Sequence, residues 1–173
     1  MEFKLDQALE VLTGTPAVLN ALLRGRSEGW LTSRVSPESF SPIDVVGHLT
    51  LADRTNWIPR AELILSGDGT RTFEPFDRFA FQPLIEGKTA DALLDEFAAT
   101  RKQSLLTLRD LGIGFRELEM RGKHPEFGEV SLSQLLATWV VHDLGHTSQI
   151  VKAMSSAYRD AVGSWRAYLT ILN

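Results

Sequence analysis

The apolar residues of this chain recur with the period of an α-helix in four long segments. In the last of these, residues 131–154, apolar side chains return every three or four positions, as at Leu132, Leu136 and Trp139. The same spacing runs through residues 3–23, 41–66 and 89–112. Each such helix has one apolar stripe to bury. Four of them, with one long crossover connection, predict an all-α four-helix bundle.

Local signals mark the expected helix ends. Residues 41–44, SPID, combine a serine N-cap, a first-turn proline and an acid at the third helical position. Residues 131–134, SLSQ, form a capping box. The first segment is either one helix with a break near Gly14 or two helices in series, and Pro59 is expected to kink the second segment.

Other regions lack a clear helical period. Residues 67–88 hold glycines, prolines and four phenylalanines, and we expect a long connection whose aromatic side chains pack onto the bundle. A few residues near 117–121 have a weak strand pattern, and a short helix is expected over 164–172. No internal repeat occurs, so residues 1–173 are expected to form a single domain.

Composition argues against several classes of protein. Of 173 residues, 43% are apolar and 23% are charged, near the averages for globular domains. A net charge of −4 argues against a nucleic-acid binder. The N-terminus lacks the apolar core of a signal peptide, and no stretch approaches the ~20 apolar residues of a membrane span, so we expect a cytoplasmic protein without membrane contact. The absence of cysteine excludes disulfides and thiolate ligands.

Three histidines are the candidate ligands of a metal ion. His142 and His146, in the run HDLGH, lie four residues apart, so a helix projects both imidazoles from one face. His48, in the run VVGHL, would supply a third ligand from a distant segment. Three protein ligands leave a coordination position open for water or substrate, as in catalytic zinc sites.

A helical wheel, at about 100° per residue, places all three histidines on or beside an apolar stripe. A lone histidine there is more often a hydrogen-bonded core residue than a ligand. Three together would need several separate partners, whereas one ion satisfies all of them. Asp44 either caps its helix or holds the second ring nitrogen of His48. His124 lies in a loop and is expected to face solvent.

Further polar residues also fall on inward helix faces. Arg101 and Asp143 lie in the middle of their apolar stripes, and Asp53 and Asn56 lie on the inward side of the second long segment. An unpaired buried arginine is very costly. Arg101 should therefore pair with Asp53 or Asp143 and fix the helix register, or it should meet an anionic substrate.

The run VVGHLTLADR, followed much later by HDLGHTSQI, resembles the DinB/YfiT-like superfamily of metalloenzymes over nearly the whole chain. The ending at residues 162–165, VGSW, is similar to one branch of that superfamily. The resemblance implies a four-helix bundle that binds one divalent metal ion, usually zinc or nickel, through three histidines matching His48, His142 and His146. It also implies function classes, namely transferases that use bacillithiol or mycothiol and a maleylpyruvate isomerase.

The expected function follows from the open coordination position. A metal held by three histidines lowers the pKa of bound water to about 7, or binds a cosubstrate thiol as a thiolate. Together with the function classes that the resemblance implies, this leads us to expect a metal-dependent transferase, isomerase or hydrolase acting on a small molecule, with a low-molecular-weight thiol as candidate cosubstrate and a homodimer left open. Asp53, Arg101 and Asp143 are candidates for supporting or substrate-binding roles, and no general base is identified.

Two alternatives stand beside this expectation. HDLGH can be compared with the HExxH motif of zinc proteases, with Asp143 in place of the glutamate, although aspartate is shorter and those motifs have their third ligand downstream. The other alternative is a non-enzymatic stress or binding protein in which the metal only stabilises the fold. Removing the metal should then unfold the chain.

Overall fold

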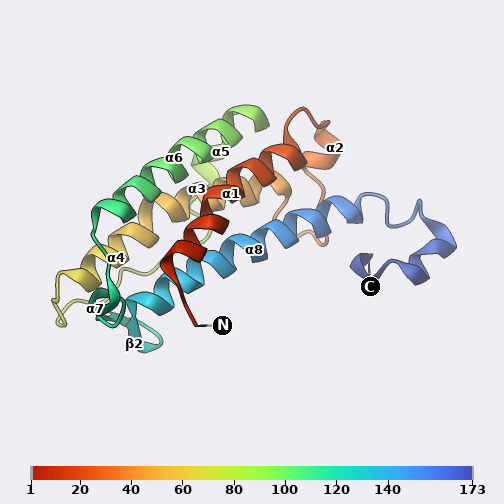
Figure 1. The fold of residues 1–173 in the computed structure, drawn as a ribbon. Helices are drawn as coiled ribbons and strands as arrows, with labels where there is room; N and C mark the ends of the chain where they lie inside the picture. Colours follow the sequence, from red (N-terminus) through yellow and green to blue (C-terminus); the bar gives the residue numbers. More distant parts are fainter. Residues whose placement is uncertain (1, 173) are drawn as a thin grey trace.

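The computed structural model describes residues 2–172, and helices make up most of it. The long helices α1 and α8 run in one direction, whereas α3, its continuation α4, and α6 run in the other (Figure 1). Contacts place them around the bundle in the order α1, α6, α3, α8. The predicted four-helix bundle is confirmed. The bounds are α1 (Leu5–Leu23), α3 (Pro42–Thr55), α4 (Trp57–Leu65), α6 (Ala90–Asp110) and α8 (Leu132–Ser156).

Both predicted capping boxes are present at helix starts. At α3, the backbone N–H of Asp44 donates to Ser41 Oγ at 3.3 Å, and the N–H of Ser41 donates to the Asp44 carboxylate at 2.8 Å. At α8, Ser131 and Gln134 exchange the same two bonds at 3.2 and 2.8 Å. These reciprocal bonds satisfy donors that a helix N-terminus leaves free, so they fix where each helix begins.

Two prolines inside predicted helices have different effects. Pro16 lies within α1, which continues unbroken, so the break expected near Gly14 does not occur. Near Pro59 the helix is interrupted at Asn56, where α3 ends and α4 begins. Because proline has no N–H for the carbonyl of Thr55 and its ring crowds that carbonyl, the interruption falls just before Pro59.

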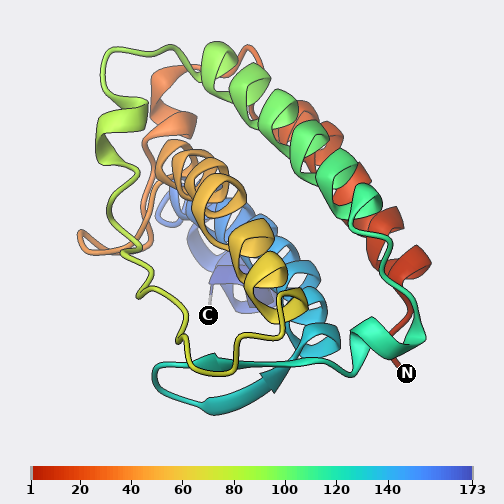
Figure 2. The same ribbon diagram turned by 90° about the vertical axis from the view of Figure 1, so that its left-hand side faces the viewer.

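The crossover between α4 and α6 runs back along the outside of the bundle (Figure 2). It contains one short helix, α5 (Gln82–Ile85). Phe73 and Phe81 of the crossover are buried, as expected for aromatics that pack onto the bundle, whereas Phe79 is 44% exposed. Gly47 lets α5 approach α3 closely, because a Cβ at this position would lie 2.5 Å from the side chain of Ile85.

The remaining elements are short, and two of them correct the sequence prediction. The strand expected near 117–121 begins only at Arg121, and the helix expected over 164–172 consists of two 3-10 segments. The two strands pair antiparallel, with Arg121 opposite Ser131. The bounds are α2 (Glu28–Leu31), α7 (Phe115–Leu118), β1 (Arg121–His124), β2 (Gly128–Ser131), η1 (Gly163–Tyr168) and η2 (Thr170–Leu172).

The apolar core consists of two clusters of buried side chains. One includes Trp57 and Trp139, whose rings stack 5.7 Å apart, and the other includes Phe97 and Ile150. Along α6, the buried Arg101 falls between residues of the two clusters. Over residues 2–172, no helix combines the length and the apolar character that a membrane crossing requires.

Candidate metal centre

Three histidines from two antiparallel helices meet in the structure. Helix α8 presents His142 and His146 one turn apart, and α3 presents His48 beside them. Nε2 of His142 lies 3.2 Å from Nε2 of His48 and 3.2 Å from Nε2 of His146. One ring nitrogen from each residue lies within 4.8 Å of the other two. The structure thus brings His48 to a pair of histidines that begins 94 residues further along the sequence.

The partners of the outer ring nitrogens indicate how the histidines are protonated. His48 Nδ1 lies 3.2 Å from the carbonyl oxygen of Arg78 in the crossover, and His146 Nδ1 lies 2.9 Å from Oε1 of Gln149. A carbonyl oxygen only accepts hydrogen bonds, so in each neutral ring Nδ1 carries the hydrogen and Nε2 keeps a lone pair. The lone pairs of His48 and His146 therefore face Nε2 of His142.

Burial favours the neutral form of all three rings. Burial, followed by the charge of His146, lowers the pKa of His48 to about 4 and that of His142 to about 3. Burial also lowers the pKa of His146. Neutral imidazoles are the form that binds metal ions, so the cluster is ready for a cation at neutral pH.

The donor set fits a divalent cation. One hydrogen on Nε2 of His142 could be donated to only one of the two facing lone pairs, which would leave the other unsatisfied. A tetrahedral zinc ion with bonds of about 2.0–2.1 Å separates its nitrogen ligands by about 3.3 Å. That separation is close to both 3.2 Å distances. The outer nitrogen of His142 differs from the other two, because it is buried and has no hydrogen-bond partner within residues 2–172.

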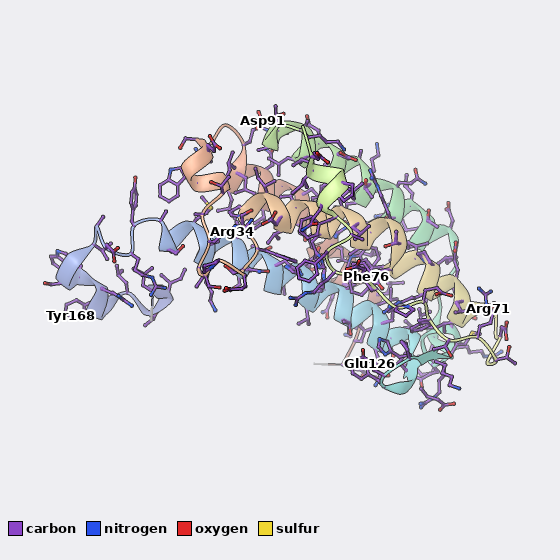
Figure 3. All side chains as sticks on the ribbon, turned by 180° about the vertical axis from the view of Figure 1, so that it is seen from behind. Arg34, Arg71, Phe76, Asp91, Glu126 and Tyr168 are labelled. Atoms are coloured by element: carbon purple, nitrogen blue, oxygen red, sulfur yellow. The ribbon has the colours of Figure 1, made fainter. Side chains whose placement is uncertain are left out.

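A cavity of about 710 Å³ borders the histidines. Its volume is in the range of sites that hold small molecules. The rings of Phe40 and Phe76 lie 5.6 and 5.5 Å from the ring of His48, and Figure 3 labels Phe76 on the crossover and Glu126 on the hairpin. The walls come from α3, α4 and α8, from the segment between α2 and α3, and from the crossover and the hairpin of β1 and β2. The lining residues are Glu38, Ser39, Phe40, His48, Asn56, Arg60, Pro75, Phe76, Arg78, His124, Pro125, Glu126, Phe127, His142, His146 and Gln149.

Comparison with known proteins places this chain in a family. The sequence of residues 12–150 matches the profile of the DinB superfamily. The chain belongs to the DinB superfamily. No curated protein matches the chain significantly.

Among solved structures, the fold is similar to that of YfiT from Bacillus subtilis. The TM-score is 0.72 at 22% sequence identity, and the likeness covers 92% of this chain and 88% of that one. YfiT is described as "a probable metal-dependent hydrolase with an unusual four-helix bundle topology". Membership of the DinB superfamily confirms the relationship predicted from the histidine runs, and the likeness to YfiT confirms the fold.

Next to the histidines, this DinB-superfamily bundle buries an ion-pair cluster centred on Arg101. Its guanidinium donates to both carboxylate oxygens of Asp53, at 2.6 and 2.9 Å, and to both of Asp143, at 2.5 and 3.1 Å. The fifth N–H donates to the carbonyl of Leu12, which Pro16 leaves without its helical partner. Every guanidinium donor is thus satisfied, and Arg101 is only 1% exposed. We therefore assign Arg101 to the internal ion pair and not to a substrate.

Two carboxylates share one guanidinium in this cluster, which we call the Arg101 cluster. Burial raises the pKa of Asp53 to about 6 against the opposing charge of Arg101. The two aspartates raise the pKa of Arg101 although its burial acts the other way. The arginine therefore stays charged between the two aspartates. The charge of Asp143 opposes the effect of burial on the pKa of His146, whereas the charge of Arg101 adds to the lowering of the pKa of His142.

The structure settles two alternatives that the sequence left open. Asp44 caps α3 and forms an ion pair with Arg34 at 2.5 Å, whereas His48 Nδ1 meets the crossover instead. Asp143 is held by Arg101 and is 1% exposed, so it does not stand where the glutamate of an HExxH motif would act on substrate. The comparison of HDLGH with zinc proteases is therefore wrong for this DinB-superfamily chain.

Two residues near the centre have roles that sequence reasoning missed. His124, expected to face solvent, is half-buried in the cavity wall, where its ring stacks on Phe127 at 4.4 Å. That expectation is wrong because the hairpin folds toward the cavity, and a loop position carries no period that would reveal this. Arg78 supports His48 through its backbone carbonyl, and a backbone group leaves no mark in the sequence.

Proposed function

We propose that the protein is a metal-dependent enzyme that binds one divalent ion, zinc or nickel, through His48, His142 and His146. One observation carries this proposal, namely that ring nitrogens of three neutral histidines converge beside an open cavity. Structural zinc sites are closed by four protein ligands, whereas three histidines leave room for another ligand. The proposed substrate is a small molecule in that cavity, and neither nucleic acid nor membrane is a proposed partner.

Hydrolysis is the reaction that we favour. A divalent ion held by neutral histidines acts as a Lewis acid and lowers the pKa of coordinated water. The likeness to YfiT, described as a probable metal-dependent hydrolase, supports this class. The chain's own residues keep the ligand rings neutral, hold His48 and His146 through their outer nitrogens, and flank the centre with two phenylalanine rings.

A thiol-dependent transferase or isomerase is the second candidate. The DinB/YfiT-like resemblance includes enzymes that use a low-molecular-weight thiol. This chain has no cysteine, so the thiol would have to come from a cosubstrate. A cavity of about 710 Å³ has room for a thiol and a small acceptor together.

Metal analysis tests the centre itself. The purified wild-type protein should contain about one divalent ion per chain, measured by inductively coupled plasma mass spectrometry. His48→Ala and His142→Ala should each bring the content close to zero, because each removes one of three ligands. His124→Ala removes a cavity histidine outside the cluster and should keep the ion. Full metal content in both ligand variants would refute the proposed centre.

An activity screen then separates the two reaction classes. Zinc-loaded and nickel-loaded protein should be incubated with small esters and amides, and separately with an electrophile such as 1-chloro-2,4-dinitrobenzene with and without an added thiol. Product formation without thiol supports hydrolysis, and turnover only with thiol supports the transferase. No turnover of either kind by the metal-loaded protein would favour the non-enzymatic alternative.

A further inference from the structure

Two arginines in the cavity wall have no carboxylate partner among the residues that the structure describes. Arg60 of α4 donates to the backbone carbonyl of Glu74 at 3.0 Å, and its guanidinium carbon lies 5.1 Å from the ring centre of Phe73. The guanidinium carbon of Arg78, in the crossover, lies 4.6 Å from the ring centre of Phe79. These contacts orient both side chains but leave their charges uncompensated.

Both arginines line the cavity that borders the histidines. Arg78 lines the cavity together with His48. After burial, the charge of Arg60 adds to the lowering of the pKa of His124. Glu38 and Glu126 also line the cavity, yet neither forms an ion pair with either arginine in residues 2–172. The two cations are therefore free to meet an anion there.

Arg60 is stronger evidence for an anion in the cavity than Arg78 is, because Arg60 is half-buried. Its position in the cavity wall partly removes its charge from water, and this burial lowers its pKa. Partial desolvation of a cation without a counterion is unfavourable, and an oxyanion that enters the cavity would relieve this cost. Arg78 is exposed at the rim, where it can meet the same anion without a desolvation cost.

A third polar group in the cavity points to a neutral part of the same ligand. Asn56 lies one helical turn before Arg60 and is 6% exposed. Its Oδ1 is buried and accepts no hydrogen bond from the described part of the chain. An unsatisfied buried acceptor costs stability, so this oxygen suits an N–H or O–H donor of a ligand. Phe40, Phe76 and Phe127 add apolar surface to the same cavity.

We propose that the cavity binds a small organic anion whose carboxylate or phosphate group meets Arg60 and Arg78, whose N–H or O–H group donates to Asn56, and whose apolar part packs on the phenylalanines. Only the further step, in which this molecule is the substrate of the histidine centre, rests on the proposed metal-dependent function. Anion recognition itself depends on the two arginines and can be tested without metal.

Binding of matched probes tests the proposal. The probes are 3-phenylpropionate, its neutral amide 3-phenylpropionamide, and phenyl phosphate, each titrated by calorimetry into metal-free and zinc-loaded full-length protein. In the metal-free protein, the carboxylate or the phosphate should bind at least about tenfold more tightly than the amide, because charge-assisted hydrogen bonds to a guanidinium are strong. The tighter of the two anions identifies the preferred group. Equal affinity of all three probes would overturn the proposal.

Variants assign the preference to the two arginines. Arg60→Gln and Arg78→Gln should each reduce the anion-over-amide ratio, and the double variant should bring it close to one. Arg78→Gln keeps the backbone carbonyl that holds His48, and Arg60→Lys keeps the charge and should retain most of the preference. Arg109→Gln, at an exposed position of α6, makes the same change in net charge and should leave the ratio unchanged. An unchanged ratio in a double variant that melts like wild type would overturn the assignment.

Metal content, measured on the same samples, keeps this proposal separate from the proposed function. Wild-type protein that prefers the anions but binds no metal would refute the metal-dependent function and support the anion site. Protein that binds one metal ion but does not distinguish anions from the amide would refute the anion site and leave the metal centre standing.

Discussion

Two polar groups lie next to each other inside the bundle, and they differ in how their hydrogen-bonding capacity is used. In the Arg101 cluster, all five guanidinium N–H groups have acceptors, and the three side chains are almost fully buried. In the histidine cluster, the lone pairs of His48 and His146 face His142 beside a cavity, and the outer nitrogen of His142 has no partner within residues 2–172. Satisfied polar groups hold helices in register, whereas convergent lone pairs mark a place for a cation.

The two groups also depend on each other, because both join α3 to α8. Asp53 and His48 belong to α3, and Asp143 and His142 belong to α8. By tying Asp53 to Asp143, Arg101 sets how these helices lie against each other, and so it sets the separation of the histidines. Substitutions in the Arg101 cluster should therefore change mainly the stability of the fold, whereas substitutions in the histidine cluster should change mainly metal binding.

The largest expected effect is a loss of stability when the Arg101 cluster is broken. Arg101→Leu leaves two buried carboxylates without their partner, and removal of one member of a buried ion pair costs about 3–5 kcal/mol. For a chain of this size, the melting temperature should fall by roughly 6–20 °C. Arg54→Leu removes an arginine from an exposed ion pair and should cost less than about 1 kcal/mol. Equal melting of both variants would remove the distinction between the clusters.

The next effect is a difference in how the two clusters respond to pH in metal-free protein. The lowered pKa values of His48 and His142 give stability that is present above about pH 6.5 and is lost as pH falls toward 4. The raised pKa of Asp53 acts in the opposite sense, giving stability at low pH that is lost as pH rises through about 6. The histidines have the larger combined shift, so we expect a net loss of roughly 3 kcal/mol between pH 6.5 and 4.

Denaturant unfolding at a series of pH values measures this loss. The double variant His48→Ala and His142→Ala keeps the Arg101 cluster, and its stability should no longer fall over this range. An unchanged fall in the double variant would show that the histidines are not its source.

Metal removal should have a smaller effect and should leave the fold intact. Because apolar packing and the Arg101 cluster hold the helices, chelated protein should keep its helical circular dichroism. Zinc at a hundredfold excess over its Kd should add about 2.7 kcal/mol to the free energy of unfolding. Loss of helical structure on chelation would instead indicate a metal that serves only the fold, and would make the two clusters alike.

The smallest expected effect concerns the support of a single ligand. Gln149→Ala removes the acceptor of His146 Nδ1 and should weaken zinc binding by about tenfold to a hundredfold, as loss of such supports does in other metal sites. The melting temperature of the metal-free protein should hardly change. Gln103→Ala, at an exposed position of α6, is the control and should change neither property. Competition with a chromophoric chelator would measure the zinc affinity of each variant.

The parts of the fold that local chemistry determines could be predicted from the sequence. The starts of α3, α6 and α8 follow from capping side chains at Ser41, Thr89 and Ser131, since a cap acts within one turn. The spacing of apolar residues shows which faces of α3, α6 and α8 point inward, and it places the Arg101 cluster and the histidine cluster inside the bundle. Continuity of α1 through Pro16 was not predictable locally, because a side chain from α6 satisfies the carbonyl that this proline leaves free.

The parts of the candidate site that lie on irregular segments could not be predicted. The crossover has no period, so the carbonyl of Arg78 and the positions of its phenylalanines depend on packing against distant helices. The same holds for His124, which the hairpin brings to the cavity wall. The ion pair between Arg101 and Asp53 is seen in the structure, whereas metal binding and a single domain over residues 1–173 stay predictions.

Because His48 is hydrogen-bonded to the crossover, the order of the crossover affects how firmly this candidate metal ligand is held. One residue, Arg78, holds a ligand ring with its backbone and offers its side chain at the rim of the cavity. A molecule that binds the Arg78 side chain and orders the crossover would also restrict the motion of the His48 imidazole. If that molecule raises the affinity for the metal ion, thermodynamic reciprocity requires that bound metal raise the affinity for the molecule by the same factor. The protein would then bind its metal ion most tightly while a molecule occupies the cavity. Release of the product would lower the affinity for the ion again.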